Sequence, residues 1–225
     1  MPDLNTKSDA ESHNNEKSDA ESHNNDQAQT RLPTQTELEK VAEVDILDKN
    51  GDKKKFSSLW SSHSDKPRRR TIVIFIRHFN CESCADYVRA LTAKLSPEDL
   101  ASRSIPTELF IVGCGSHTFI RTYIQRTGCK FEIYTDPSRV TYDTLGMTCN
   151  LGLGKKPNYI TNSLMGTLIG TGNTLMTLLT DSGKKSQNGG ELIWVDGEIK
   201  WARRMQNTRD HVEVEELERV LDEQE

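Results

Sequence analysis

Residues 71–91 read TIVIFIRHFNCESCADYVRAL, and this stretch decides how the rest of the chain is placed. It begins with five consecutive apolar residues at 72–76, a run that is typical of a strand buried on both faces. Two cysteines follow in a CxxC spacing. Apolar residues then repeat at helical spacing: Ala85, Val88 and Leu91. The stretch therefore predicts a central strand, a pair of thiols and a helix, in that order.

The two thiols, Cys81 and Cys84, lie at the predicted junction of strand and helix. Unpaired N–H groups and the helix dipole stabilise negative charge there, so a thiol at this position has a lowered pKa. A CxxC spacing near a β–α–β pattern is typical of a thioredoxin-like redox pair, because a disulfide can close without moving the helix. On this interpretation the more exposed Cys81 is the nucleophile, and Cys84 resolves the mixed disulfide.

A second apolar run, at residues 108–112, precedes a predicted helix across residues 119–124. The right-handed crossover rule makes the strands at 72–76 and 108–112 parallel neighbours. Their carboxyl ends then lie together, which places Cys114 and His117 within reach of the CxxC pair.

The remaining segments complete an α/β domain with helices on both faces of the sheet. We expect a hairpin at 38–60 turning at Asn50-Gly51, a helical turn capped by Ser96 before Pro97, a strand at 131–135 closed by Asp136-Pro137, a helix at 138–147, an insertion at 148–188 with one or two amphipathic helical segments, a hairpin after Gly189-Gly190 turning at Asp196-Gly197, and a closing helix within 210–221. The expected fold class is a thioredoxin-like three-layer α/β fold, with a central mixed sheet, an N-terminal β-hairpin and a helical insertion before the last hairpin.

The N-terminal region differs in composition from the rest of the chain. The sequence KSDAESHNN at residues 7–15 recurs unchanged at 17–25, and such a polar repeat cannot bury apolar surface. We therefore expect a disordered tail at 1–36 and one thioredoxin-like domain at 37–225. The tail holds seven acidic and three basic side chains, so −4 of the net charge of −5 belongs to it.

The domain is thus nearly neutral, which argues against nucleic acid as a partner because phosphate binding needs a basic face. The basic run at residues 66–70 is expected to be a solvated loop before the buried strand. No apolar run approaches the roughly 20 residues of a membrane span, and the N-terminus lacks the apolar core of a signal peptide. We expect no membrane association and a cytoplasmic location, where cysteines do not form a structural disulfide framework.

Two alternatives to a redox pair stay open. Residues 114–117 form a CxxH, so the chain contains the ligand set of a Cys₃His zinc site, although structural zinc usually stabilises small modules with little core. The CxxC pair could also belong to a non-catalytic sensing or binding module that oxidises slowly. We expect neither a bound metal nor a cofactor.

Other side chains near the pair have both a chemical and a structural interpretation. Arg77 can stabilise a thiolate or bind a peroxide oxygen, or it can form a salt bridge at the strand end. His78 can act as a base, but a surface or hydrogen-bonded role is simpler. Cys114 can be a further resolving thiol or a small core residue. Cys129 and Cys149 have no spacing signal, and we expect both to be inert.

Four segments together resemble a known family. They are FIRHFNCESC at 75–84, LFIVGCGSH at 109–117, EIYTDPSRVTYDTLGM at 132–147 and GGELIWVDGEIKWARRMQNTRDH at 189–211. From about residue 40 to its end the chain is similar to the peroxiredoxin-like branch of the alkyl hydroperoxide reductase/thiol-specific antioxidant (AhpC/TSA) family, which has a thioredoxin fold. The resemblance implies thiol-dependent reduction of peroxides by Cys81 and Cys84, with Arg77 assisting.

The resemblance also implies partners and a sheet order. The partners are a small-molecule peroxide or lipid endoperoxide and a thioredoxin- or glutaredoxin-type reductant. The strand at 72–76 lies between those at 108–112 and 191–195. Typical members have a Thr three residues before the peroxidatic cysteine, and Cys81 stands in that Thr place here. This alignment makes Cys84 the first attacker, so the order of attack stays open.

Overall fold

The structure is a computed structural model that describes residues 28–61, 68–160 and 182–223. Its elements are, in chain order, α2 (Gln35–Ala42), β1 (Asp45–Leu47), β2 (Lys53–Lys55), the 3₁₀ helix η1 (Phe56–Leu59), β3 (Arg70–Phe75), α3 (Glu82–Lys94), α4 (Pro97–Ala101), β4 (Thr107–Gly113), α5 (Phe119–Thr127), β5 (Glu132–Thr135), α6 (Val140–Thr144), β6 (Gly190–Val195), β7 (Glu198–Arg204) and α8 (Val214–Asp222). The repeat tail and the leucines of the predicted insertion helices lie outside the described residues. The domain boundaries therefore stay a prediction.

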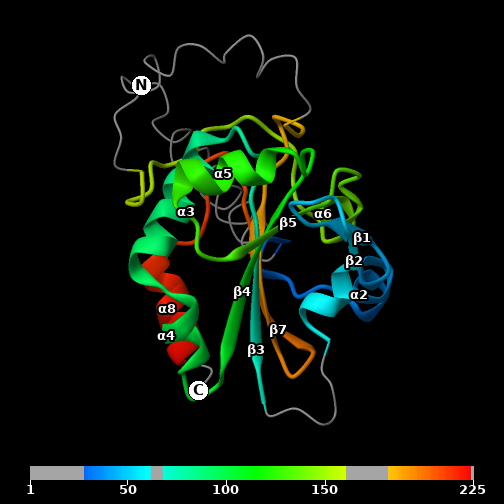
Figure 1. The fold of residues 1–225 in the computed structure, drawn as a ribbon, viewed down its shortest axis with the longest axis vertical. Helices are drawn as coiled ribbons and strands as arrows, with labels where there is room; N and C mark the ends of the chain where they lie inside the picture. Colours follow the sequence, from blue (N-terminus) through cyan, green and yellow to red (C-terminus); the bar gives the residue numbers. More distant parts are fainter. Residues whose placement is uncertain (1–27, 62–67, 161–181, 224–225) are drawn as a thin grey trace, which may run out of the picture.

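One mixed sheet of seven strands forms the centre of the molecule (Figure 1), in the order β2-β1-β5-β4-β3-β6-β7. Strand β4 is parallel to β3 and β5, as the crossover rule predicts. Strand β6 is antiparallel to β3 on its other side, with Gly190 opposite Phe75. The expected position of the first apolar run, between the second run and the last hairpin, is confirmed.

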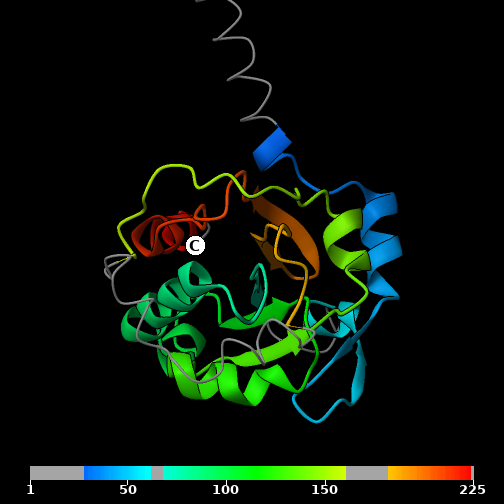
Figure 2. The same ribbon diagram turned by 90° about the horizontal axis from the view of Figure 1, so that it is seen from above.

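Strand β3 is buried on both faces because its side chains alternate between two hydrophobic cores. Ile72 and Ile74 belong to a first core, which is shared with α3, α5 and α8. Val73 and Phe75 belong to a second core, which is shared with α2, η1 and α6. Figures 1 and 2 show α3 and α8 on one side of the sheet and α2 and α6 on the other. A strand covered on both sides has no polar face, which explains its five consecutive apolar residues.

Turns close the strands where the sequence predicts them. Asp196 and Gly197 have φ angles of 54° and 84°, the positive values that a tight hairpin turn requires. Asp136 is a turn residue, as expected, and its carboxylate accepts the N–H groups of Arg139 and Thr141. This turn uses the first residues of the helix predicted at 138–147, so α6 is shorter than expected.

Helix α2 was not expected from the sequence. Thr34 and Glu37 form a capping box at its start, and Leu38 and Val41 pack into the second core. In the part of the chain that the structure describes, no helix has the length and apolarity that a membrane crossing requires.

The backbone before β6 runs tightly against β3. A Cβ atom at Gly189 would stand 1.7 Å from the Phe75 carbonyl oxygen, so only glycine permits this approach. Residues 182–188 consequently lie beside the loop that follows β3, where the Phe79 N–H donates to the Ser182 carbonyl at 3.2 Å. The end of the predicted insertion thus forms one wall around the two thiols.

Candidate active site

The loop between β3 and α3 places both cysteines at the first turn of α3. Cys81 is the N-cap residue, and its Sγ accepts the N–H of Cys84 at 3.3 Å. The Cys84 Sγ donates to the Cys81 Sγ at 2.7 Å. Both side chains are buried, with 4% of Cys81 and 0% of Cys84 exposed. A disulfide between these sulfurs, which are bonded at about 2.05 Å when oxidised, requires only a small movement.

The surroundings give the two thiols opposite acidities. Burial alone would raise the pKa of Cys81, but the hydrogen bond from the Cys84 thiol and the charge of Arg77 outweigh it and lower that pKa to about 6. Burial, together with the adjacent Cys81 sulfur, raises the pKa of Cys84 well above its ordinary value. At neutral pH the pair therefore holds one proton, which resides on Cys84.

Arg77 is held against the Cys81 sulfur by backbone carbonyl groups. Its Nη1 lies 3.5 Å from the Cys81 Sγ, its Nε donates to the Gln187 carbonyl at 3.0 Å, and its Nη2 donates to the Lys185 carbonyl. The side chain is buried. A positive charge in this fixed orientation stabilises a thiolate. Of the two interpretations considered from the sequence, this is the chemical one, and the other was a salt bridge at the strand end.

Cys114 and His117 do not join the pair. The Cys114 Sγ donates to the Arg77 carbonyl at 2.9 Å and packs in the second core, on the opposite face of the sheet from Cys84. His117 lies against the first hairpin turn, with its Nε2 3.0 Å from the position of a Cβ at Gly51. Within the described ranges no three His, Cys, Asp or Glu side chains are grouped as a metal site requires. The Cys₃His arrangement is therefore not assembled there.

The remaining sequence candidates differ in their environment. His78 is buried, so the expectation of a surface histidine is wrong, and its Nδ1 has no hydrogen-bond partner among the described residues. Burial and the charge of Arg77 lower its pKa to about 4. Burial raises the pKa of Cys129 to about 11, which keeps it a thiol. Cys149 is exposed, with its Sγ 3.4 Å from the Lys184 Nζ.

A cavity of 460 Å³ opens beside Cys81. Arg77 and Lys185 contribute to its polar wall, and Leu151 and Leu153 form an apolar wall. These leucines are 66% and 60% exposed. Clustered apolar side chains that remain exposed mark binding sites more often than ordinary surface, which makes this cavity a candidate binding site.

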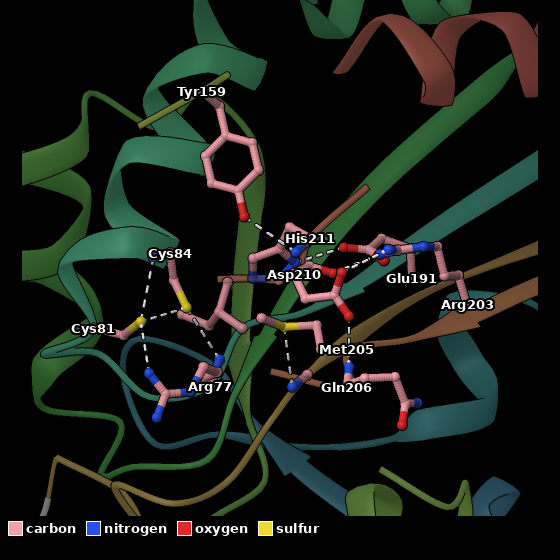
Figure 3. Close-up of polar contacts among 12 residues, drawn as sticks. Arg77, Cys81, Cys84, Tyr159, Glu191, Arg203, Met205, Gln206, Asp210 and His211 are labelled. Atoms are coloured by element: carbon pink, nitrogen blue, oxygen red, sulfur yellow. Dashed lines mark hydrogen bonds and ion pairs between the residues drawn. The ribbon is translucent and has the colours of Figure 1, made fainter. Parts of the chain in front are cut away.

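A buried polar pair that we did not identify from the sequence lies behind the cysteines (Figure 3). Glu191 of β6 and His211 approach to 2.5 Å, and neither side chain is exposed. The sequence held one signal, because Glu191 precedes the apolar run LIWV in a predicted buried strand and a buried carboxylate needs a partner. That partner follows 20 residues later, in a loop whose position only the fold defines.

Known proteins resemble this chain in sequence. Residues 90–207, which are more than half of the chain, match the family model described as AhpC/TSA antioxidant enzyme. The chain is 34% identical over 176 residues to the peroxiredoxin-like 2C proteins of Mus musculus and Homo sapiens, which covers 76% of this chain and 74% of each relative. It is 26% identical over 179 residues to the Arabidopsis thaliana protein named thioredoxin-like protein AAED1, chloroplastic, covering 77% of this chain and 68% of that one.

Solved peroxiredoxin structures show a similar fold. A mutant of Xanthomonas campestris peroxiredoxin Q has a TM-score of 0.51 at 12% identity, covering 83% of this chain and 92% of that one. A mutant of Xylella fastidiosa PrxQ gives 0.51 at 12% identity, with 82% and 92% covered. At this identity the likeness concerns the fold alone, and it confirms the thioredoxin-like fold class.

The family match, the identity to the relatives and the four sequence segments agree with one another, and together they support a redox function of the oxidoreductase class. The chain therefore belongs to the AhpC/TSA antioxidant enzyme family.

Proposed function

We propose that this chain is a thiol oxidoreductase that reduces hydroperoxides through a disulfide between Cys81 and Cys84. The observation that carries the proposal is the 2.7 Å contact between the two sulfurs at the start of α3. The lowered pKa of Cys81, about 6, supplies a thiolate, and Cys84 keeps a proton beside it. A two-cysteine peroxidase needs this combination, because a thiolate attacks and a second thiol then resolves.

Three observations support Cys81 as the first attacker. It lines the 460 Å³ cavity, it caps the helix N-terminus, and it has the more acidic thiol. Cys84 is fully buried, and its pKa is raised by burial. These properties favour the thioredoxin-like order over the alignment that makes Cys84 peroxidatic.

The proposed cycle has three steps: attack on the peroxide, formation of the disulfide and reduction of the disulfide. The Cys81 thiolate attacks the terminal oxygen of a hydroperoxide, the O–O bond breaks, and the alkoxide leaves and takes up a proton from solvent to form an alcohol. Cys81 is then a sulfenic acid. The Cys84 sulfur attacks the Cys81 sulfur, its proton goes to the departing hydroxide, and water and a disulfide result. A thioredoxin- or glutaredoxin-type dithiol reduces this disulfide and becomes oxidised itself.

Arg77 assists in this scheme as a fixed positive charge. Its guanidinium faces the Cys81 sulfur at 3.5 Å, while carbonyl groups of residues 185 and 187 hold the rest of the group. It stabilises the thiolate before attack, and it is positioned to donate to a peroxide oxygen as negative charge develops there.

The cavity favours an organic substrate over hydrogen peroxide. Leu151 and Leu153 offer exposed apolar surface beside Cys81, and Lys185 offers a positive charge. An organic or lipid hydroperoxide, or a lipid endoperoxide with an acidic group, matches this combination of an apolar and a basic wall. We propose that neither nucleic acid nor a membrane is a partner of this chain.

Intact mass spectrometry after one equivalent of cumene hydroperoxide tests the proposal. We expect a loss of two hydrogens that maps to a Cys81–Cys84 disulfide. Turnover with a thioredoxin or glutaredoxin system should be lost in Cys81→Ser and in Cys84→Ser, whereas Cys129→Ser, a buried thiol with a pKa of about 11, serves as the matched control. Unchanged turnover in both site variants would refute the proposal, and a bridge from Cys81 to Cys114 would reassign the resolving thiol.

A redox-sensing module is the second candidate, and the low exposure of the pair favours it. With 4% of Cys81 and 0% of Cys84 exposed, access by a protein reductant is restricted. A sensor would oxidise without sustained turnover and would leave a partner trapped on Cys81 as a mixed disulfide in Cys84→Ser. Multiple turnovers per minute with a reductant system would exclude this candidate.

We further propose a cytoplasmic location, because a reducing compartment keeps the pair and the other three cysteines as thiols. The Arabidopsis relative is named as chloroplastic, so a plastid is the competing compartment. Fractionation of cells that express the full chain, with detection by antibody, distinguishes the two.

A further inference from the structure

His78 lines the cavity beside Cys81, but it has no part in the cycle proposed above. Only 7% of the residue is exposed, and in the part of the chain that the structure describes its Nδ1 has no hydrogen-bond partner. A buried polar group without a partner destabilises the free protein, and a ligand that bonds to the imidazole recovers that loss. A polar atom of a bound substrate is therefore a suitable partner for this ring.

The backbone around His78 fixes where its side chain begins. The His78 carbonyl accepts the Cys81 N–H at 3.0 Å, which closes a turn between the two residues. One residue further on, the Phe79 N–H donates to the Ser182 carbonyl. Gly183 packs against the base of the side chain, because a Cβ atom there would stand 2.9 Å from the His78 Cβ. The ring is thus attached at a fixed point beside Cys81 before a substrate binds, as a preorganised group must be.

The His78 imidazole is uncharged at neutral pH. Burial, followed by the charges of Arg77, Lys185 and Arg126, lowers its pKa to about 4. A group with this pKa is a weak base near pH 7 and has no acidic proton to give, so the role of a base that we considered from the sequence does not suit it. Its one N–H can still donate a hydrogen bond to an oxygen.

The leaving oxygen of an organic hydroperoxide needs a donor in this cavity. When the terminal oxygen is at the Cys81 sulfur, the second oxygen carries the organic group and therefore lies within the cavity. Negative charge develops on this second oxygen as the O–O bond breaks, and a preorganised donor in a water-excluded site stabilises such charge strongly. Leu151 and Leu153 line the same cavity, but their side chains offer no donor.

Resting on the peroxide-reducing function proposed above, we propose that His78 is a catalytic residue of this reaction: its neutral imidazole donates a hydrogen bond to the oxygen that leaves. Arg77 faces the attacking sulfur at 3.5 Å, so His78 acts at the other end of the bond that breaks. A neutral imidazole suits this position, because it polarises an oxygen without adding a further positive charge beside Arg77.

His78 gives up no proton in this step. A bond forms between the Cys81 sulfur and the terminal oxygen, the O–O bond breaks, and its electron pair moves to the leaving oxygen. The sulfur loses two electrons and the peroxide gains two. The alkoxide then takes up a proton from solvent, while His78 keeps its own proton and lowers the energy of the developing anion.

The test compares two oxidants that differ in their leaving group. Cumene hydroperoxide releases a basic alkoxide, whereas peracetic acid releases acetate, a stable anion that needs little help from a donor. The second-order rate constant for formation of the Cys81–Cys84 disulfide is measured with each oxidant by intact mass spectrometry after acid quenching. Alkylation of Cys81 by iodoacetamide, which has iodide as its leaving group, separately reports the ionisation and accessibility of the thiol.

The variants remove one donor at a time. His78→Phe keeps a ring without an N–H group, and His78→Gln keeps a donor without the ring. Thr208→Val is included because Thr208 also lines the cavity, is 6% exposed, and has an Oγ1 without a hydrogen-bond partner among the described residues. His117→Phe is the matched control, because His117 lies against the first hairpin turn at Gly51.

In His78→Phe we expect cumene hydroperoxide to react about a hundredfold more slowly and peracetic acid less than about fivefold more slowly, with alkylation unchanged. His78→Gln should recover most of the loss, and His117→Phe should match the wild type. An equal fall with both oxidants would overturn the inference, and so would a leaving-group effect in Thr208→Val without one in His78→Phe. Because the two oxidants are compared within one variant, His78→Leu gives the same test if His78→Phe does not fold. Failure of the wild type to form the disulfide with either oxidant would instead refute the proposed function, and that outcome is seen before any variant is compared.

Discussion

Replacing Arg77 by methionine should make the Cys81 thiol less acidic. The Arg77 Nη1 lies 3.5 Å from the Cys81 Sγ. At an effective dielectric constant of about 20, two unit charges at this distance attract by roughly 5 kcal/mol, an upper value that corresponds to about 3.5 pKa units. The guanidinium charge is delocalised and the hydrogen bonds from Cys84 remain, so we expect about two-thirds of this effect. The pKa of Cys81, about 6 in the wild type, should rise to about 8.

The assay is alkylation of the reduced protein by iodoacetamide, with the modification of Cys81 followed by mass spectrometry across the pH range. A pKa of about 8 leaves roughly one-tenth of the thiol ionised at pH 7, against roughly nine-tenths for a pKa of about 6. Alkylation at pH 7 should therefore slow by about tenfold in Arg77→Met, and peroxide turnover by at least as much.

The control is Arg77→Lys, which keeps a positive charge but loses the planar group that contacts the Lys185 and Gln187 carbonyls. In Arg77→Lys the pKa of Cys81 should lie between the Cys81 pKa of the wild type and that of Arg77→Met. Circular dichroism should show that both variants are folded. An unchanged titration midpoint in folded Arg77→Met would refute the reasoning. It would mean that the hydrogen bonds from Cys84 hold the thiolate without help from the guanidinium.

His78, Gly189 and the two exposed leucines lead to three further predictions. Because the pKa of buried His78 is lowered from 6.5 to about 4, the unfolded chain binds an extra proton between these values, so the free energy of unfolding should fall by about 3 kcal/mol from pH 7 to pH 4. Urea titrations should show this loss reduced in His78→Gln, and an equal loss in both proteins would contradict the assignment. Gly189→Ala should destabilise the fold by at least about 3 kcal/mol in urea unfolding, because its Cβ would collide with the Phe75 carbonyl, and a near-neutral effect would show that β6 can shift. Replacing Leu151 and Leu153 by serine should raise the KM for a long-chain hydroperoxide by about tenfold and leave that for hydrogen peroxide unchanged, whereas equal effects on both substrates would exclude an apolar subsite.

Much of the fold follows from local patterns in the sequence. The five apolar residues at 72–76 predict a strand covered on both sides, and the Asp196-Gly197 pair predicts the last hairpin. These signals are local, because side-chain periodicity and turn conformation depend on neighbouring residues. Helix α2 was missed since its eight residues give a short signal, and the Thr34 cap stabilises it only together with packing into the second core.

The candidate site was predicted in part. Spacing identifies Cys81 and Cys84 as a pair, but it does not say which thiol carries the proton. Their acidities depend on burial and on the direction of the Arg77 guanidinium, which carbonyl groups more than 100 residues away hold in place. The same limit explains why Cys114, although it follows the neighbouring strand, packs on the opposite face of the sheet.

By itself the sequence determined the strand, the CxxC pair, the helix and the family to which the chain belongs, because each of these is carried by residues close together along the chain. Only the tertiary structure decided that Glu191 and His211 form a buried pair behind the dithiol, that residues 182–188 orient Arg77, and that Leu151 borders the cavity beside Cys81. These contacts join segments that are distant in sequence, and their pairing depends on how the sheet and its two layers of helices pack.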